Sequence, residues 1–165
     1  MYYLIAALAV TVPLLVRAEN REAHWQIYFF KPLSTLLIIA VAALALGQDG
    51  ADRHSTLGVL VGLVLALGGE VALMFQQRQS SFLAGLVAFL LGHIAYTVTF
   101  HLFAAPSAVD LVSAVALLAL AIPLYRLLAP GLGSMRLPVI AYFLVISLMV
   151  HQSIALLAGE LLGPE

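Results

Sequence analysis

LGVLVGLVLALGGEVALMF, the stretch Leu57–Phe75, decides the fold class of this chain. Glu70 is the one charged residue among its 19 residues. At 1.5 Å of rise per residue, a helix of this length crosses a hydrocarbon core about 30 Å thick. Lipid leaves the polar edge of an open sheet unsatisfied, so the stretch predicts a membrane-spanning helix.

Five similar apolar segments accompany it, and short polar or turn-forming links separate them. Across the whole chain 64% of the 165 residues are hydrophobic, 9% are charged, and the mean hydropathy is +1.11. These values are typical of a membrane protein and leave no polar surface for a separate soluble domain. We therefore predict an all-α integral membrane helical bundle of about six transmembrane helices, one domain over residues 1–165. The other five segments are Tyr2–Val16, Ile27–Leu46, Phe82–Phe103, Leu111–Leu128 and Leu137–Leu162.

The same composition excludes several classes of function. Cysteine is absent, which excludes disulfides, thiolate chemistry and cysteine-ligated metals. The net charge of −1 and the lack of a Lys/Arg-rich run argue against nucleic acid as a partner. His93, His101 and His151 lack the four-residue spacing of a helical zinc site, so we expect neither a metal nor another cofactor.

The basic residues predict the orientation in the membrane. The start of the chain, MYYLIAALAV, lacks a basic region and is interpreted as a retained first span. Loops rich in Lys and Arg stay in the cytoplasm, and on one side of the bundle the links hold only Arg53. We therefore expect a multi-pass protein of the inner cell membrane with the first, third and fifth links in the cytoplasm. Those three links hold Arg17, Arg21, Arg78, Arg126 and Arg136.

Two charges inside apolar segments, Lys31 and Glu70, are the first candidates for function. A charge in hydrocarbon costs about 2.5–3.5 kcal/mol on insertion scales, so such residues are usually functional. Ser34 and Thr35 follow Lys31 by three and four residues and share its helix face. Two structural alternatives remain open: Lys31 snorkels to the interface, or the two charges form an ion pair that only fixes helix packing.

Small residues predict where Glu70 points. Gly58, Gly62, Ala66 and Gly69 recur at steps of four and three, which lets another helix approach closely. Glu70 follows this small-residue face and is expected to point into the bundle. His93 and Tyr96, three residues apart in the next segment, lie on or beside a similar stripe. For His93 the structural alternative, a packing residue, remains open.

Three motifs in order resemble the YhhN family of membrane proteins, the lysoplasmalogenases. The first is WQ at 25–26 followed by FKPL at 30–33, and the second is ALGGE at 66–70. The third begins at Phe82 and Gly85 and ends with FLLGH at 89–93 and Tyr96. The family usually has Gly-Asp where this chain has Gly69-Glu70. The resemblance also implies about two further helices, with a second acidic motif, which are absent after Glu165.

The resemblance implies an integral membrane hydrolase. It would cleave the vinyl ether bond of a lysoplasmalogen, a lysophospholipid in the bilayer, to a fatty aldehyde and a glycerophospho-headgroup. Glu70 would act as the acid, and His93 and Tyr96 would hold water or relay the proton. Lys31, with Ser34 and Thr35 on its face, would bind the lipid phosphate. The alternative is a non-enzymatic lipid-binding membrane module or a small carrier for an anionic solute.

Overall fold

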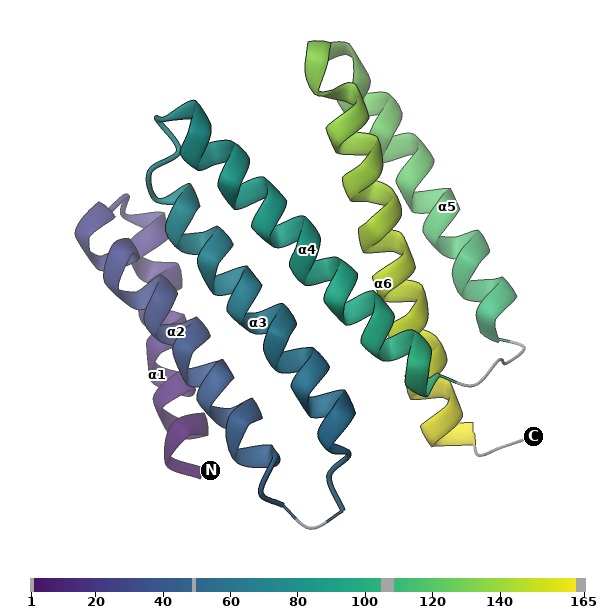
Figure 1. Ribbon diagram of the computed structural model, residues 1–165. Helices are drawn as coiled ribbons and strands as arrows, with labels where there is room; N and C mark the ends of the chain where they lie inside the picture. The colour runs from purple at the N-terminus through teal and green to yellow at the C-terminus, as the bar shows by residue number, and fades with distance from the viewer. Residues whose placement is uncertain (1, 49, 105–108, 163–165) are drawn as a thin grey trace. The chain divides into compact units, whose positions relative to one another are not determined.

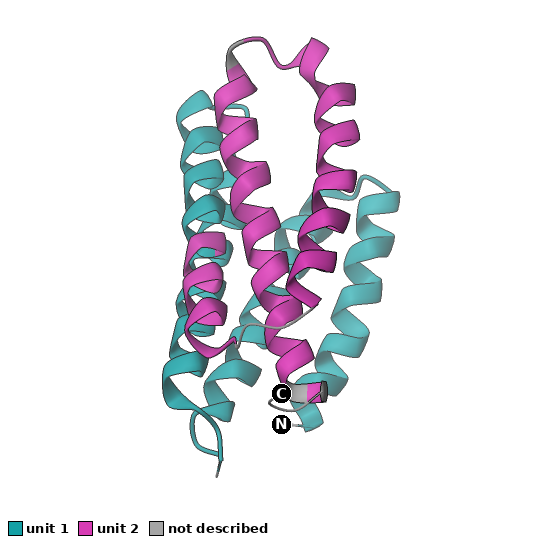
Figure 2. Ribbon diagram, turned by 90° about the vertical axis from the view of Figure 1, so that its right-hand side faces the viewer, with its two compact units in different colours: residues 1–92 teal, residues 93–165 magenta. Residues whose placement is uncertain are grey.

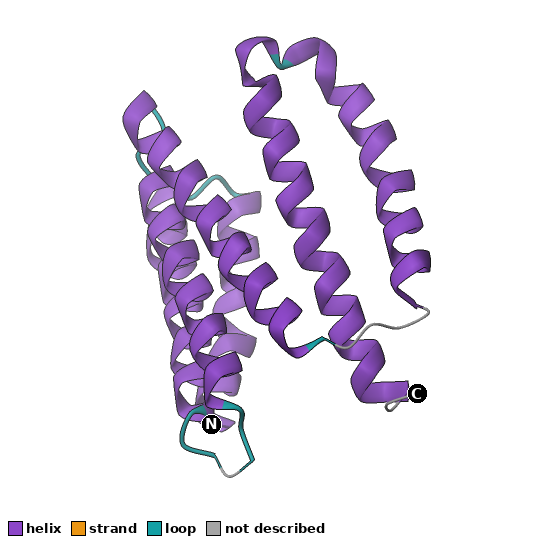
Figure 3. Ribbon diagram, turned by 45° about the vertical axis from the view of Figure 1, so that its right-hand side comes forward, coloured by secondary structure: helices purple, strands orange, loops and turns teal. Residues whose placement is uncertain are grey.

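The structure of the protein, a computed structural model, describes residues 2–48, 50–104 and 109–162. Within these ranges it is helical and contains no strand (Figures 1 and 3). Six helices are long and apolar enough to cross a membrane, which confirms the predicted all-α transmembrane class. They are α1 (Tyr2–Asn20), α2 (His24–Ala45), α3 (Arg53–Leu73), α4 (Gln79–Phe103), α5 (Val109–Leu128) and α6 (Arg136–Leu162). Two short 3-10 turns, η1 (Ala129–Gly131) and η2 (Gly133–Met135), connect α5 to α6.

The chain divides into two compact units, residues 1–92 and 93–165, and the boundary falls within α4 (Figure 2). In the first unit α1 packs on α2 and α2 on α3. In the second unit α5 packs on α6. The single domain expected over residues 1–165 stays a prediction.

Buried positions in the described part of the chain are occupied by small or hydroxyl side chains. The buried apolar residues are alanines, while large aliphatic side chains such as Leu111 and Leu137 are 74% and 78% exposed. This distribution suits a bilayer, because lipid is as apolar as leucine and helices associate through close packing and hydrogen bonds. Apart from glycines, the buried residues of the described ranges are Ala18, Ala155, Ala158, Thr11, Ser34, Thr35, Thr99 and Ser113.

Glycines bring α3 and α4 together within the first unit. A Cβ atom on Gly69 would lie 2.6 Å from Cδ2 of Phe89. A Cβ on Gly92 would lie 3.1 Å from the carbonyl oxygen of Gly62, which is backbone and cannot turn aside. Gly62 and Gly69 are both buried, as the predicted small-residue face requires.

The link between α1 and α2 is shorter than the sequence predicts. The first span was expected to end at Val16, but α1 continues to Asn20 and α2 begins at His24. Glu22 adopts a left-handed conformation, with φ of 52°, which reverses the chain within three residues. As a result Arg17 and Glu19 belong to the last turns of α1 and keep fixed positions relative to α2.

Candidate functional site

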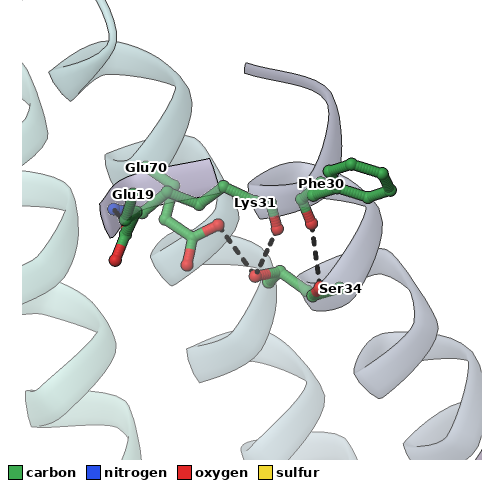
Figure 4. A network of polar contacts seen from close by, with 6 residues as sticks. Glu19, Phe30, Lys31, Ser34 and Glu70 are labelled. Atoms are coloured by element: carbon green, nitrogen blue, oxygen red, sulfur yellow. Dashed lines mark hydrogen bonds and ion pairs between the residues drawn. The ribbon is translucent and has the colours of Figure 1, made fainter. Parts of the chain in front are cut away.

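A polar network joins α1, α2 and α3 around Glu70 (Figure 4). The hydroxyl of Thr35 in α2 donates a hydrogen bond of 2.8 Å to Oε2 of Glu70 in α3. Thr35 is 8% exposed and Glu70 is half-buried. A short bond at a buried interface restricts the carboxyl group, leaving Oε1 as the oxygen not bonded to Thr35.

Lys31 makes its ion pair with Glu19. The Nζ atom lies 3.7 Å from Oε1 of Glu19, and the two side chains are 41% and 49% exposed. Within the described ranges no ion pair joins Lys31 to Glu70. The ion pair between Lys31 and Glu70 that the sequence left open is therefore not formed, and Glu19 takes the place of Glu70 as the partner of Lys31. The backbone carbonyl oxygen of Lys31 lies 3.4 Å from the Thr35 hydroxyl. The Thr35 hydroxyl thus contacts the backbone of Lys31 and the carboxyl group of Glu70, but the two charged side chains form no ion pair with each other.

The remaining residue on this face, Ser34, is turned toward its own helix. Its hydroxyl donates to the carbonyl oxygen of Phe30 at 2.8 Å, and the side chain is 5% exposed. One turn before Lys31, the Tyr28 hydroxyl donates to the carbonyl oxygen of Met74 at 3.2 Å. This bond fastens the start of α2 to the residue that follows α3. The end of the first unit that carries Glu70 is therefore held by two contacts between α2 and the α3 segment.

His93 and Tyr96 belong to the second unit. Their rings form an edge contact with centroids 6.5 Å apart, and the His93 ring is tilted against Tyr142 of α6 at 5.5 Å. Tyr96 also stacks on Phe100 one turn later at 6.1 Å. These contacts orient His93 within an aromatic cluster. That His93 and Tyr96 hold water or relay a proton for Glu70 stays a prediction.

A second polar contact in the second unit joins α5 to α6. The Ser113 hydroxyl lies 2.7 Å from Nδ1 of His151 and 3.0 Å from the carbonyl oxygen of Asp110. If the hydroxyl donates to the carbonyl, it accepts from the Nδ1–H of the imidazole, and Nε2 then carries the lone pair. Ser147 precedes His151 by four residues and so shares its face of α6. The true partner comes from another helix, which spacing along one helix does not reveal.

Sequence reasoning also missed Glu19 as the partner of Lys31. The sequence put Glu19 in the polar link between the first two predicted spans. The one feature that could have indicated the pair is that Glu19 is an acidic residue close to the start of the helix that carries Lys31. Among the described residues, no three or more His, Asp and Glu side chains lie close enough together to hold a metal ion. The chemistry available at Glu70 is therefore that of a carboxyl group, a hydroxyl group and a nearby ammonium group.

Six apolar helices with a half-buried carboxyl in one of them define a multi-pass integral membrane protein. The sequence profile of the YhhN family matches residues 26–162, and the chain belongs to this family. Among curated proteins it is similar to the "Uncharacterized membrane protein YhhN" of Escherichia coli O6:H1, Escherichia coli O157:H7 and Shigella flexneri. Each is 31% identical over 100 residues, which cover 61% of this chain.

The aligned region covers 45% of the length of these relatives, so the chain spans less than half of them. No solved structure matches the chain.

Proposed function

We propose that the chain is a membrane hydrolase that cleaves the vinyl ether bond of lysoplasmalogens. The observation that carries the proposal is the state of Glu70 in α3. Its carboxyl group is half-buried in a spanning helix, accepts a hydrogen bond from Thr35 and has no ion pair with Lys31. Membership of the YhhN family supports the same assignment.

The chemistry of the substrate requires an acid. A vinyl ether is hydrolysed when a proton is added to its β-carbon, which leaves an oxocarbenium ion at the α-carbon. Water adds to that carbon, and its released proton returns to the carboxylate. The resulting hemiacetal then breaks its bond to the glycerol oxygen, giving an aldehyde and an alcohol. In this scheme Oε1 of Glu70 delivers the proton while Thr35 holds Oε2.

The pairing of Lys31 with Glu19 fits this role of Glu70. An ammonium group placed directly on Glu70 would keep the carboxylate ionised and unable to donate. The Lys31–Glu19 pair is half-exposed, and such pairs contribute little stability, about 0–1 kcal/mol. A lipid phosphate can therefore replace Glu19 at Nζ. We assign Lys31 to the phosphate, with Ser34 and Thr35 on the same face of α2.

The remaining assignments rest on the sequence and the family. We propose that His93 and Tyr96 hold the attacking water or relay its proton, and that no metal or cofactor takes part. We also propose that the protein lies in the inner cell membrane with the first, third and fifth links in the cytoplasm. This places the Lys31 and Glu70 end of the first unit on the cytoplasmic side.

The test is aldehyde release from a lysoplasmalogen by the purified full chain in lipid nanodiscs. The wild type is expected to release one aldehyde per glycerophospho-headgroup, and Glu70→Gln to lose about 10²-fold or more of kcat. Glutamine keeps the shape and the bond from Thr35 but cannot donate a carboxylic proton. Lys31→Ala is expected to raise KM more than it lowers kcat, because a phosphate contact acts equally on ground and transition states.

Glu19→Gln is the matched control, since it removes a neighbouring carboxylate outside the proposed chemistry. It is expected to stay within a few-fold of wild-type kcat. Undiminished kcat in a folded Glu70→Gln variant would refute the role of Glu70. Solute flux into vesicles without aldehyde release would instead identify a carrier, and bound lipid without either would identify a lipid-binding module.

A further inference from the structure

Arg17 and Arg21 form a basic ridge at the end of α1 that the proposed hydrolysis does not use. Arg17 lies in the last turn of α1 and Arg21 lies in the turn that follows it, and both side chains are exposed. Neither guanidinium group has a hydrogen bond or ion pair within the described residues. Two unpaired guanidinium groups side by side are a strong receptor for a phosphate, because each presents planar donors that match its oxygens.

Two surface grooves meet at this ridge, and both include the two arginines. One has a volume of about 490 Å³ and continues between α1 and α2, and the other has about 520 Å³ and is lined by α1 and the turn that follows it. The first is completed by Leu14, Ala23, Gln26 and Phe30. The second is completed by Val12, Pro13, Val16 and Asn20.

The order of polar and apolar residues along the grooves matches the order of headgroup and acyl chains in a phospholipid. Arg17 lies in the last turn of α1 and Arg21 in the turn after it, where the apolar span ends and we expect the membrane interface. Val12, Pro13 and Leu14 lie about one turn deeper, roughly 5–8 Å at 1.5 Å per residue. Neither groove contains a carboxylate among its lining residues, so the ridge carries two positive charges that face no opposing charge within either groove.

From this arrangement we propose that Arg17 and Arg21 bind the phosphate of an anionic diacyl phospholipid, with one acyl chain along each groove. The unopposed charge favours a net-negative headgroup over a zwitterionic one, whose ammonium group the arginines repel. Lys31 and Glu70 line neither groove, so this lipid is distinct from the substrate and its binding does not depend on hydrolysis.

The test is lipid binding to the purified full chain in neutral detergent, measured by native mass spectrometry. The probes are palmitoyl-oleoyl phosphatidylglycerol, the matching phosphatidylcholine and inorganic phosphate. The wild type is expected to retain one phosphatidylglycerol, to bind phosphatidylcholine at least about tenfold more weakly, and not to lose the lipid to millimolar inorganic phosphate. A tenfold difference corresponds to about 1.4 kcal/mol, which is the scale of one repulsive charge–charge interaction close to a protein surface.

The double variant Arg17→Gln/Arg21→Gln is expected to lose the preference for phosphatidylglycerol. Arg53→Gln, which removes an arginine from the start of α3, is the matched control and is expected to keep it. The lysine double variant Arg17→Lys/Arg21→Lys keeps both charges, and its preference for phosphatidylglycerol is expected to lie between those of the wild type and the glutamine variant. If the glutamine variant does not fold, the preference of the lysine variant decides whether the arginines bind the lipid. Equal binding of the two lipids by the wild type, or an undiminished preference in a folded glutamine double variant, would overturn the proposal. So would displacement of the lipid by inorganic phosphate.

Discussion

Replacing Thr35 with valine tests whether the bond to Glu70 joins α2 to α3. Valine keeps the branched shape of a residue that is 8% exposed but removes the hydroxyl that lies 2.8 Å from Oε2. Hydrogen bonds between membrane helices contribute about 0.6 kcal/mol on average, with a maximum near 1.7. Bonds to charged groups contribute about 1.5–3 kcal/mol in soluble proteins. We expect Thr35→Val to lower the free energy of unfolding by about 1–2 kcal/mol.

The assay is unfolding of the purified protein by SDS in mixed micelles, followed by circular dichroism. A double-mutant cycle of Thr35→Val with Glu70→Met isolates the pairwise energy, because each single change removes the same bond. We expect a coupling energy of at least about 0.6 kcal/mol. The same bond holds the carboxyl group in position, so Thr35→Val should also lower kcat more than it raises KM.

Ser34→Ala is the matched control for this cycle. Its hydroxyl bonds only to the carbonyl oxygen of Phe30 in the same helix, and such back-bonds stabilise helices little or not at all. We expect its effect on the free energy of unfolding to stay within about 0.5 kcal/mol. A coupling energy below about 0.3 kcal/mol, or equal losses from Ser34→Ala and Thr35→Val, would refute the reasoning.

Two further predictions concern packing and orientation. Gly69→Ala should lower the free energy of unfolding by about 1–3 kcal/mol, because its Cβ would lie 2.6 Å from the Phe89 ring. Gly68→Ala is the control and should not lower it, because a Cβ there would have no neighbour within 4 Å. Equal losses from the two variants would contradict this account of α3 packing on α4. Arg-rich links in the cytoplasm predict that an impermeant thiol reagent on intact cells labels only one of three single-cysteine variants. Labelling at the other two positions instead would reverse the orientation. The labelled position is expected to be Asp52, and the unlabelled ones Asn20 and Gln79.

The sequence by itself determined the class of the fold and the approximate position of each helix. Long apolar segments have one stable form in lipid, since a helix satisfies its own backbone hydrogen bonds. The spacing of Gly62 and Gly69 was enough to predict a closely packed face on α3. Intramembrane charge was enough to select Lys31 and Glu70, because charge in an apolar segment is costly wherever the helix packs.

The tertiary structure alone decided which polar groups meet. Lys31 pairs with Glu19, Thr35 bonds to Glu70, and His151 meets Ser113. Helical spacing predicts neighbours along one helix, whereas each of these contacts depends on the rotation and axial offset of two helices against each other. The offset of α1 against α2 depends on the tight turn at Glu22, which hydropathy does not register. For the same reason the groove that Arg17 and Arg21 share with Gln26 and Phe30 became visible only once α1 was placed against α2.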